Sequence, residues 1–163
     1  EKIEQIEKLN KDEIIQYYKE SADDGHIESM YKYGMIVLIG DGVPVDKKEA
    51  ARYLKDAAEY DHVEGMFKYG GMLIIGDGVQ QDKEEASEYF KNVACKGHAN
   101  AMYNYAIMLK NGEGIEADKE KAVKYLKKAI EADQPDAMYT YGLMLYNDGK
   151  SKDKKETIRL FKS

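Results

Sequence analysis

Cysteine, proline and tryptophan are nearly missing from this sequence of 163 residues. It has one cysteine, two prolines and no tryptophan. A single thiol cannot close an internal disulfide or supply a thiolate-rich metal site, and it favours a reducing, cytoplasmic compartment. We expect Cys95 to be a small packed residue at the end of a helix, as free cysteines commonly are. Scarce proline favours an all-helical chain, because proline breaks helices.

The sequence also lacks basic charge and long apolar runs. Its net charge is −6 at pH 7, which argues against nucleic-acid binding, because phosphates require a basic face. A membrane span needs about 18 apolar residues in a row, and neither such a run nor a signal peptide is visible. The sequence begins at Glu1 and not at methionine, so the lack of a targeting segment excludes little.

The main positive feature is a period of 36 residues. It relates four methionines, four tyrosines and three glycines: Met30, Met66, Met102 and Met138; Tyr33, Tyr69, Tyr105 and Tyr141; Gly40, Gly76 and Gly112. A fixed period of this size is typical of proteins built from stacked repeats. One helical hairpin cannot bury both of its faces, so its stability must come from stacking on its neighbours.

Each repeat is predicted to hold a front helix followed by a back helix. In the first repeat, apolar residues at helical spacing predict a front helix from about His26 to Ile39. Gly40-Asp41-Gly42 ends it, because glycine accepts the left-handed backbone of a helix C-terminus. Asp46, with Glu49 completing a capping box, begins the back helix, which runs to about Tyr60.

We expect a single domain, 1–163, divided by this period. Its parts are an N-terminal helix or half repeat at 1–25, repeats at 26–61, 62–97 and 98–133, and a last, truncated repeat at 134–163. In the last repeat Leu160 and Phe161 take back-helix positions, and the sequence stops midway through that helix at Ser163. Small residues in mid-helix, such as Gly34 opposite Ala50, predict a close crossing of front and back helices.

The registered motifs resemble those of one repeat family. In the first repeat they read Met30-Tyr-Lys-Tyr-Gly34, Gly40-Asp-Gly-Val43, Asp46, Ala50, Tyr53, Ala57-Ala58 and His62. This order is similar to the Sel-one-like repeat (SLR), a relative of the tetratricopeptide repeat (TPR). The pattern covers residues from about 10 to 161, four times over.

The resemblance implies an all-α fold, a right-handed α/α superhelix (solenoid) of antiparallel helix pairs. It also implies a non-catalytic scaffold or adaptor that binds another protein or a peptide on a concave face lined by front helices. The bacterial cysteine-rich branch of the family carries paired cysteines in each repeat. Cys95 alone excludes that disulfide framework and weakens the β-lactam-binding activity associated with that branch. A hydrolase or β-lactam-binding role is therefore the second reading, and end-to-end self-association through the open end at Ser163 is the third.

Three front-helix columns lie beside the core stripe and are not needed for it. They form the predicted partner-binding face: Tyr31, Lys32, Met35, Phe67, Lys68, Gly71, Tyr103, Asn104, Ile107, Tyr139, Thr140 and Leu143. Rings beside amide and ammonium donors suit an extended peptide, because the rings cover apolar side chains and the donors meet carbonyls or a carboxylate. Packing of these rings between neighbouring front helices is the alternative, and the sequence leaves both open.

Catalytic and metal-binding patterns are weak. His26, His62 and His98 follow the period, but repeats stacked about 8–10 Å apart cannot bring three imidazoles to one zinc ion. Cys95 and His98 are three residues apart, which allows a thiolate–imidazole pair, although a packed Cys95 is the favoured reading. Asp41 lies in a glycine turn without the acidic pattern of a calcium loop. We therefore predict no enzyme activity, no cofactor and no metal.

Overall fold

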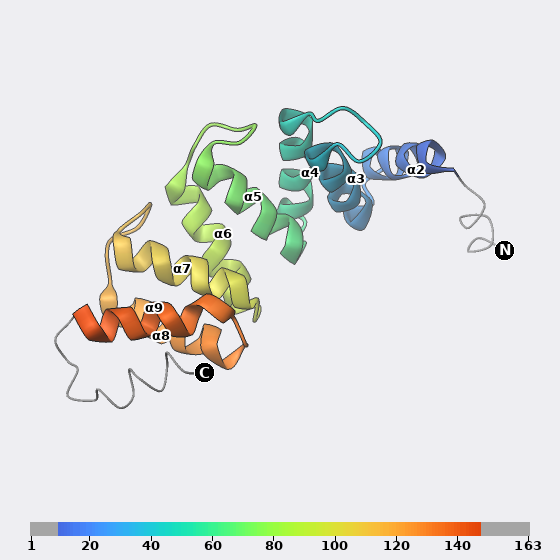
Figure 1. Cartoon of the computed structure of the whole chain (residues 1–163). Coiled ribbons are helices and arrows are strands. Elements are labelled where there is room, and N and C mark those ends of the chain that lie inside the picture. The colour runs from blue at the N-terminus through green and yellow to red at the C-terminus, as the bar shows by residue number, and fades with distance from the viewer. Residues whose placement is uncertain (1–9, 148–163) are drawn as a thin grey trace. The chain divides into compact units, whose positions relative to one another are not determined.

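The computed structural model describes residues 10–147, and the regular secondary structure of this part of the chain is all helical, with turns and loops between the helices (Figure 1). In chain order its helices are α2 (Lys11–Asp23), α3 (Ile27–Ile39), α4 (Lys47–Glu59), α5 (Val63–Ile75), α6 (Lys83–Cys95), α7 (Ala99–Asn111), α8 (Lys119–Glu131) and α9 (Pro135–Asn147). Front helices α3, α5, α7 and α9 alternate with back helices α2, α4, α6 and α8. The predicted all-α repeat fold is confirmed. The predicted back-helix residues Leu160 and Phe161 lie outside the described residues.

The helices group into two compact units, unit 1 (residues 1–82) and unit 2 (residues 83–163). In unit 1, α3 packs against α2 and α4, and α4 also packs against α5. In unit 2, α7 packs against α6 and α8, and α8 also packs against α9. Both α4 and α8 are thus covered by a front helix on each side, which is the contact that stacked repeats require.

Front helices α3, α5 and α7 begin at a histidine cap and end at a glycine. Nδ1 of His62 accepts a hydrogen bond of 3.0 Å from the backbone N–H of Gly65. His26 and His98 cap α3 and α7 in the same way. Gly40 then ends α3 with a φ of 75°, a left-handed backbone that glycine adopts without steric cost.

Back helices α2, α4 and α8 begin at acidic or amide caps. Asn10 and Glu13 form a complete capping box at the start of α2. At α4 the carboxylate of Asp46 accepts bonds of 3.0 Å from the backbone N–H groups of Lys48 and Glu49. The second bond of the predicted capping box, from the N–H of Asp46 to the side chain of Glu49, is wrong, because this N–H donates to the carbonyl of Val37. Glu49 instead accepts a bond from a tyrosine hydroxyl of the front helix.

Each acidic residue between two turn glycines pairs with the lysine near the start of the preceding back helix. These pairs are Lys11 with Asp41, Lys47 with Asp77, and Lys83 with Glu113. The hydrogen bond from Lys83 lowers the pKa of Glu113 below its ordinary value. These carboxylates therefore tie one repeat to the previous one.

The core of unit 1 lies between front and back helices. Tyr33 of α3 meets Tyr53 of α4 edge to face, with ring centroids 4.8 Å apart. A Cβ added to Gly34 would lie 3.0 Å from Cγ of Leu54 and 3.4 Å from the carbonyl oxygen of Ala50. The predicted close crossing is present, and the side chain of Leu54 fills the space above the glycine.

Unit 2 repeats this packing, with one exception to the expected burial. Tyr105 and Tyr125 meet edge to face at 4.8 Å, and Leu126 is fully buried beside them. Cys95, however, is exposed, so the prediction of a packed cysteine is wrong. Cys95 is equivalent to Glu59 of the previous repeat, one position after the buried alanines. A glutamate at the equivalent position already indicated that this position faces solvent.

Candidate functional site

In unit 1 the predicted binding face begins as a junction between repeats. The ring of Tyr31 on α3 stacks on the ring of His62, with centroids 4.7 Å apart and planes at 26°. Because Nδ1 of His62 caps α5, its Nε2 carries the hydrogen and donates to Glu28 at 3.0 Å. Lys32 is 3.4 Å from the same carboxylate. Tyr31 therefore has a packing role, as the alternative reading proposed.

Electrostatics at this junction keep Glu28 charged. The hydrogen bond from His62, with a smaller effect of Lys32, lowers the pKa of Glu28 despite partial burial. The pKa of Tyr31 is raised, first by burial and then by the negative charge of Glu64. The exposed ammonium of Lys32 lies 5.8 Å from the centre of the Tyr31 ring. At the N-terminal end of this face, the polar side chains are thus already engaged with one another.

The C-terminal end of the same helices is aliphatic and open. Ile39 of α3 and Ile75 of α5 are 64% and 69% exposed, and Met35 is half-buried. A Cβ at Gly71 would meet nothing within 4 Å. We call Met35, Ile39, Gly71 and Ile75 the aliphatic positions of unit 1.

Sequence reasoning missed Ile39 and Ile75, although both were within its reach. They lie four residues after Met35 and Gly71 and are 36 residues apart. The period and the helical spacing together could have added them to the predicted face. The other predicted residues of unit 1, Phe67 and Lys68, are half-buried on α5.

In unit 2 the predicted face includes a hydroxyl pair between two front helices. The hydroxyl groups of Tyr103 on α7 and Thr140 on α9 are 3.2 Å apart and share a hydrogen bond. Thr140 is buried, whereas Asn104 and Ile107 are half-buried. On α9, Tyr139 and Leu143 are exposed. The structure therefore places the predicted residues of unit 2 on two helices that one hydroxyl pair joins.

A recess of about 350 Å³ lies at the C-terminal ends of α7 and α9, beside the first residue of α8. We call it the unit 2 recess. Its lining residues are Lys110, Asn111, Lys119, Thr140, Leu143, Met144 and Asn147. Thr140 and Leu143 were predicted from the sequence. The others come from three helices, and no local pattern brings them together.

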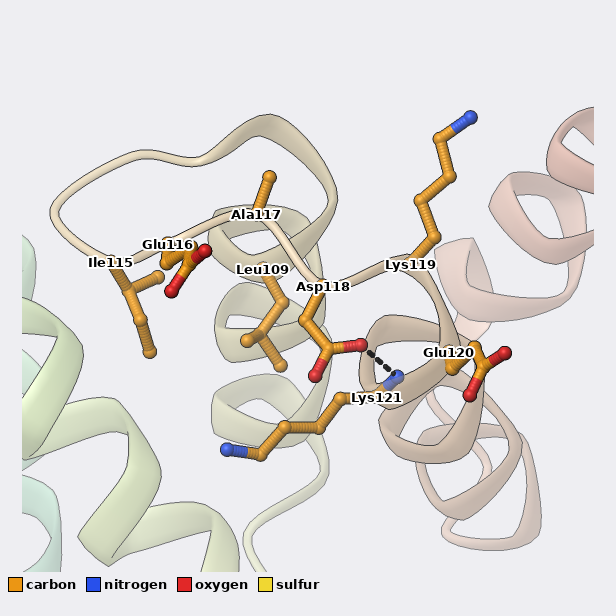
Figure 2. Close-up of a pocket in the computed structure, with 8 residues that line it drawn as sticks. All are labelled: Leu109, Ile115, Glu116, Ala117, Asp118, Lys119, Glu120 and Lys121. Carbon is orange, nitrogen blue, oxygen red and sulfur yellow. Dashed lines mark hydrogen bonds between the residues drawn. The ribbon is translucent and has the colours of Figure 1, made fainter.

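Another hollow of unit 2, of about 530 Å³, lies around the loop that joins α7 to α8 (Figure 2). It is lined by Leu109 and residues 115–121. Figure 2 shows the Asp118 carboxylate directed at the backbone nitrogen of Lys121, and their bond of 2.8 Å caps α8. Because the Asp118 carboxylate already caps α8, we interpret the hollow as a feature of the loop conformation and not as a binding site.

The weak chemical candidates have structural roles. The histidines that follow the period are helix caps, and residues 10–147 contain no cluster of three or more metal-ligating side chains. No helix within these residues is long and apolar enough to cross a membrane. Cys95 instead lies close to Tyr125, whose pKa is raised first by burial and then by this thiol.

Comparison with solved structures gives the same fold. A Sel1 repeat protein from Oxalobacter formigenes has a TM-score of 0.79 and 24% identity, over 92% of this chain and 62% of that one. The protective antigen c5321 of uropathogenic Escherichia coli, which displays an SLR fold, has a TM-score of 0.77 and 26% identity, over 86% of this chain and 29% of that one. Helicobacter pylori cysteine rich protein B has a TM-score of 0.59 and 21% identity, over 77% of this chain and 90% of that one. The chain thus spans less than two thirds of the first two proteins.

A search of curated proteins finds no match. The model of the Sel1 repeat matches four consecutive segments, residues 27–62, 63–98, 99–134 and 135–163. These segments cover most of the sequence and include the motifs from which the resemblance was drawn. The chain belongs to the Sel1 repeat family.

Proposed function

We propose that this chain is a non-catalytic interaction module that holds a peptide or a protein segment against the exposed face of its front helices. Sel1 repeat proteins generally mediate protein–protein interactions and are typically scaffolds without catalysis. Which face binds, and which partner, is the part proposed for this chain.

The observation that carries the proposal is the difference between front and back helices. Five exposed large hydrophobic side chains lie on front helices: Ile39, Ile75, Tyr139, Leu143 and Tyr146. Among the described back-helix residues one such side chain is exposed, Tyr17 of α2. The back helix α4 instead exposes lysine, arginine and glutamate, and the exposed side chains of α8 are also charged. Such a charged surface favours water, whereas exposed apolar side chains gain from being covered.

The polar groups of the front helices suit a polypeptide partner. Asn104 and Lys68 are half-buried on this face, and Lys68 has no ion pair or hydrogen bond with any described residue. An amide and an ammonium can donate to the carbonyls or carboxylates of an extended chain. Exposed Tyr139 can cover its apolar side chains.

The test compares two double substitutions of exposed hydrophobic residues. We expect Ile39→Ser with Ile75→Ser to reduce the set of proteins captured from a native extract, because it removes the two exposed isoleucine side chains of α3 and α5. Its Tm should change by no more than about 2–3 °C, because exposed substitutions have small effects.

The matched control is Val45→Ser with Tyr60→Ser, which removes exposed apolar area in a loop and at the end of α4. This variant should capture what the unaltered protein captures. Equal capture by both variants would contradict the front-face proposal. A loss of capture that accompanies an equal loss of thermal stability would assign these isoleucines to packing.

A further inference from the structure

One tyrosine in the core of unit 2 has a hydroxyl group without a hydrogen-bond partner. Tyr105 of α7 is fully buried, and its hydroxyl makes no hydrogen bond with any side chain or backbone group of residues 10–147. A buried hydroxyl in this state is destabilising, because it has given up its bonds to water without replacement. It is therefore a donor that a new acceptor beside it would satisfy.

The equivalent tyrosine pair of unit 1 has acidic partners. The hydroxyl of Tyr33 donates to the carboxylate of Glu49 at 3.4 Å, and the hydroxyl of Tyr53 donates to Asp23. The pKa of Tyr33 is raised first by burial and then by Glu49, and the charge of Asp23 raises it further. Asp23 of α2 thus lies within electrostatic reach of both tyrosines.

Unit 2 keeps the edge-to-face tyrosine pair but replaces both acids. Cys95 stands two periods after Asp23, and Lys121 stands two periods after Glu49. The remaining members of the column of Cys95, at positions 59 and 131, are glutamates. A thiol is a weak acceptor and an ammonium group is a donor only. The replaced acids therefore account for the unpaired hydroxyl.

The thiol is accessible and lies beside the tyrosine pair. Cys95 is exposed at the end of α6. The pKa of Tyr125 is raised first by burial, then by Cys95, and further by Tyr105. The pKa of Lys91 on α6 is raised first by its bond to Glu88, and Tyr105 and Cys95 raise it further. The thiol and the unpaired hydroxyl thus lie within electrostatic reach of the same two side chains.

Ammonium groups of α8 face the same two rings. Nζ of Lys121 is 5.7 Å from the centre of the Tyr105 ring, and Nζ of Lys128 is 5.2 Å from that of Tyr125. In unit 1 the guanidinium group of Arg52 has a similar place over the tyrosine that is bonded to the acid. An anionic acceptor at the end of α6 would therefore meet positive charge in unit 2 as it does in unit 1.

We propose that Cys95 is a site of oxidation by hydroperoxides. Its sulfinate form accepts hydrogen bonds from the hydroxyl groups of Tyr125 and Tyr105. A sulfinate, like a carboxylate, has one negative charge and two acceptor oxygens. The modification joins α6 to α8 as the bond between Asp23 and Tyr53 joins α2 to α4. This role goes beyond the proposed binding function and does not depend on it.

Two successive oxidations produce the sulfinate. The thiol of Cys95 loses its proton to solvent, and the thiolate attacks the terminal oxygen of a hydroperoxide. A sulfur–oxygen bond forms, the oxygen–oxygen bond breaks, and the leaving oxygen takes a proton from water to give an alcohol or water. The sulfenate then attacks a second hydroperoxide in the same way. In each step sulfur loses two electrons and the peroxide gains them. Because the sequence has one cysteine, no internal disulfide competes.

The first experiment treats the full chain with hydrogen peroxide and follows peptide mass and Tm. We expect the peptide that contains Cys95 to gain two oxygen atoms and the Tm to rise by about 2–4 °C, because a hydrogen bond to a charged group is added. The sequence also has eight methionines, so Cys95→Ser, treated identically, supplies the change due to their oxidation. A Cys95 that gains no oxygen, disulfide-linked dimers as the sole product, or a Tm change equal to that of Cys95→Ser would each overturn the proposal.

The second experiment installs the acid without an oxidant. Cys95→Asp should have a Tm about 2–4 °C above that of Cys95→Ser, and in a Tyr125→Phe background most of this difference should disappear. Asn92→Asp adds the same charge at an exposed position in the last turn of α6 and should not raise the Tm. An equal rise with Asn92→Asp, or a difference that persists in the Tyr125→Phe background, would overturn the assigned bond.

The unpaired hydroxyl has a test of its own. In the reduced chain Tyr105→Phe should leave the Tm unchanged or raise it, because it removes a buried group without a partner. Tyr33→Phe is the matched control and should lower the Tm, because it removes a hydroxyl that is bonded to Glu49. After oxidation the Tyr105→Phe chain should gain less than the unaltered chain, and an equal gain would overturn the part assigned to Tyr105.

Discussion

At the scale of single residues, histidine recurs in this chain because a neutral imidazole can cap a helix. Nδ1 of His62 accepts from the backbone N–H of Gly65, and the same bond recurs at His26 and His98. In the last repeat Gln134 takes this place, and its Oε1 accepts from the N–H of Ala137 at 2.7 Å. The property shared along the period is an acceptor at a helix N-terminus.

This role predicts different outcomes for two substitutions of His62. His62→Ala should lower the free energy of unfolding by about 1 kcal/mol more than His62→Gln, because only glutamine keeps a cap acceptor. Both variants lose the stacking on Tyr31 and the imidazole hydrogen bond to Glu28, so these losses are common to both and the difference reports the cap. Urea denaturation followed by circular dichroism measures it, and equal unfolding free energies would contradict the capping role.

Tyr53 gives a prediction for alkaline pH. Burial, assisted by its hydrogen bond to Asp23, raises the pKa of Tyr53 to about 12. Between the ordinary pKa of about 10 and this value, tyrosine at position 53 ionises in the unfolded chain and stays protonated in the folded one. The unfolded state then binds fewer protons, so stability falls as pH rises through this window.

We expect the free energy of unfolding to fall by on the order of 2 kcal/mol between pH 9 and pH 12 because of Tyr53. Tyr53→Phe should show a shallower decline over the same window, because phenylalanine does not ionise. Parallel declines in the two proteins would mean that another tyrosine is responsible.

At the scale of elements, glycine-x-glycine turns set how closely consecutive repeats approach. In unit 2, Gly114 has a φ of 69°, and a Cβ there would overlap the carbonyl group of Lys83 at the start of α6. Gly97 also has a positive φ, of 93°, but a Cβ there would meet nothing within 4 Å. Substitution of Gly97 therefore tests the backbone conformation alone, whereas substitution of Gly114 tests the backbone conformation together with the close approach of the turn to α6.

Gly97→Ala should destabilise the protein by about 1–2 kcal/mol, the cost of an unfavourable backbone for a residue with a Cβ. Gly114→Ala should cost at least about twice as much, because the carbonyl of Lys83 must also move. Thermal or urea unfolding of the two variants tests this. Similar values would show that the approach of the turn to α6 is not limiting.

At the scale of the whole molecule, chemistry divides between the two kinds of helix. Back helices such as α4 bury alanine, tyrosine and leucine on one face and expose charged residues on the other. Front helices bury a similar stripe but also expose Ile39, Ile75 and Tyr139. The buried stripes serve stacking, and the exposed front-helix surface is the one that we propose for recognition.

Sequence alone determined the helical repeat, its period and its core. Those features are local: the spacing of Tyr33, Gly34 and Val37 makes a helical stripe, and Gly40 ends it wherever it occurs. The columns beginning at Tyr31, Lys32 and Met35 were also accessible, because helical geometry places them beside that stripe.

Tertiary structure decided which of those columns remain open. The ring of Tyr31 stacks on that of His62, which is 31 positions later in the sequence, and Thr140 is bonded to Tyr103, which is 37 positions earlier. No local rule specifies contacts at such separations. The unit 2 recess gathers Lys110, Lys119 and Leu143 from three helices for the same reason. A repeating sequence dictates each hairpin, but only packing one hairpin on the next determines which side chains are left for a partner.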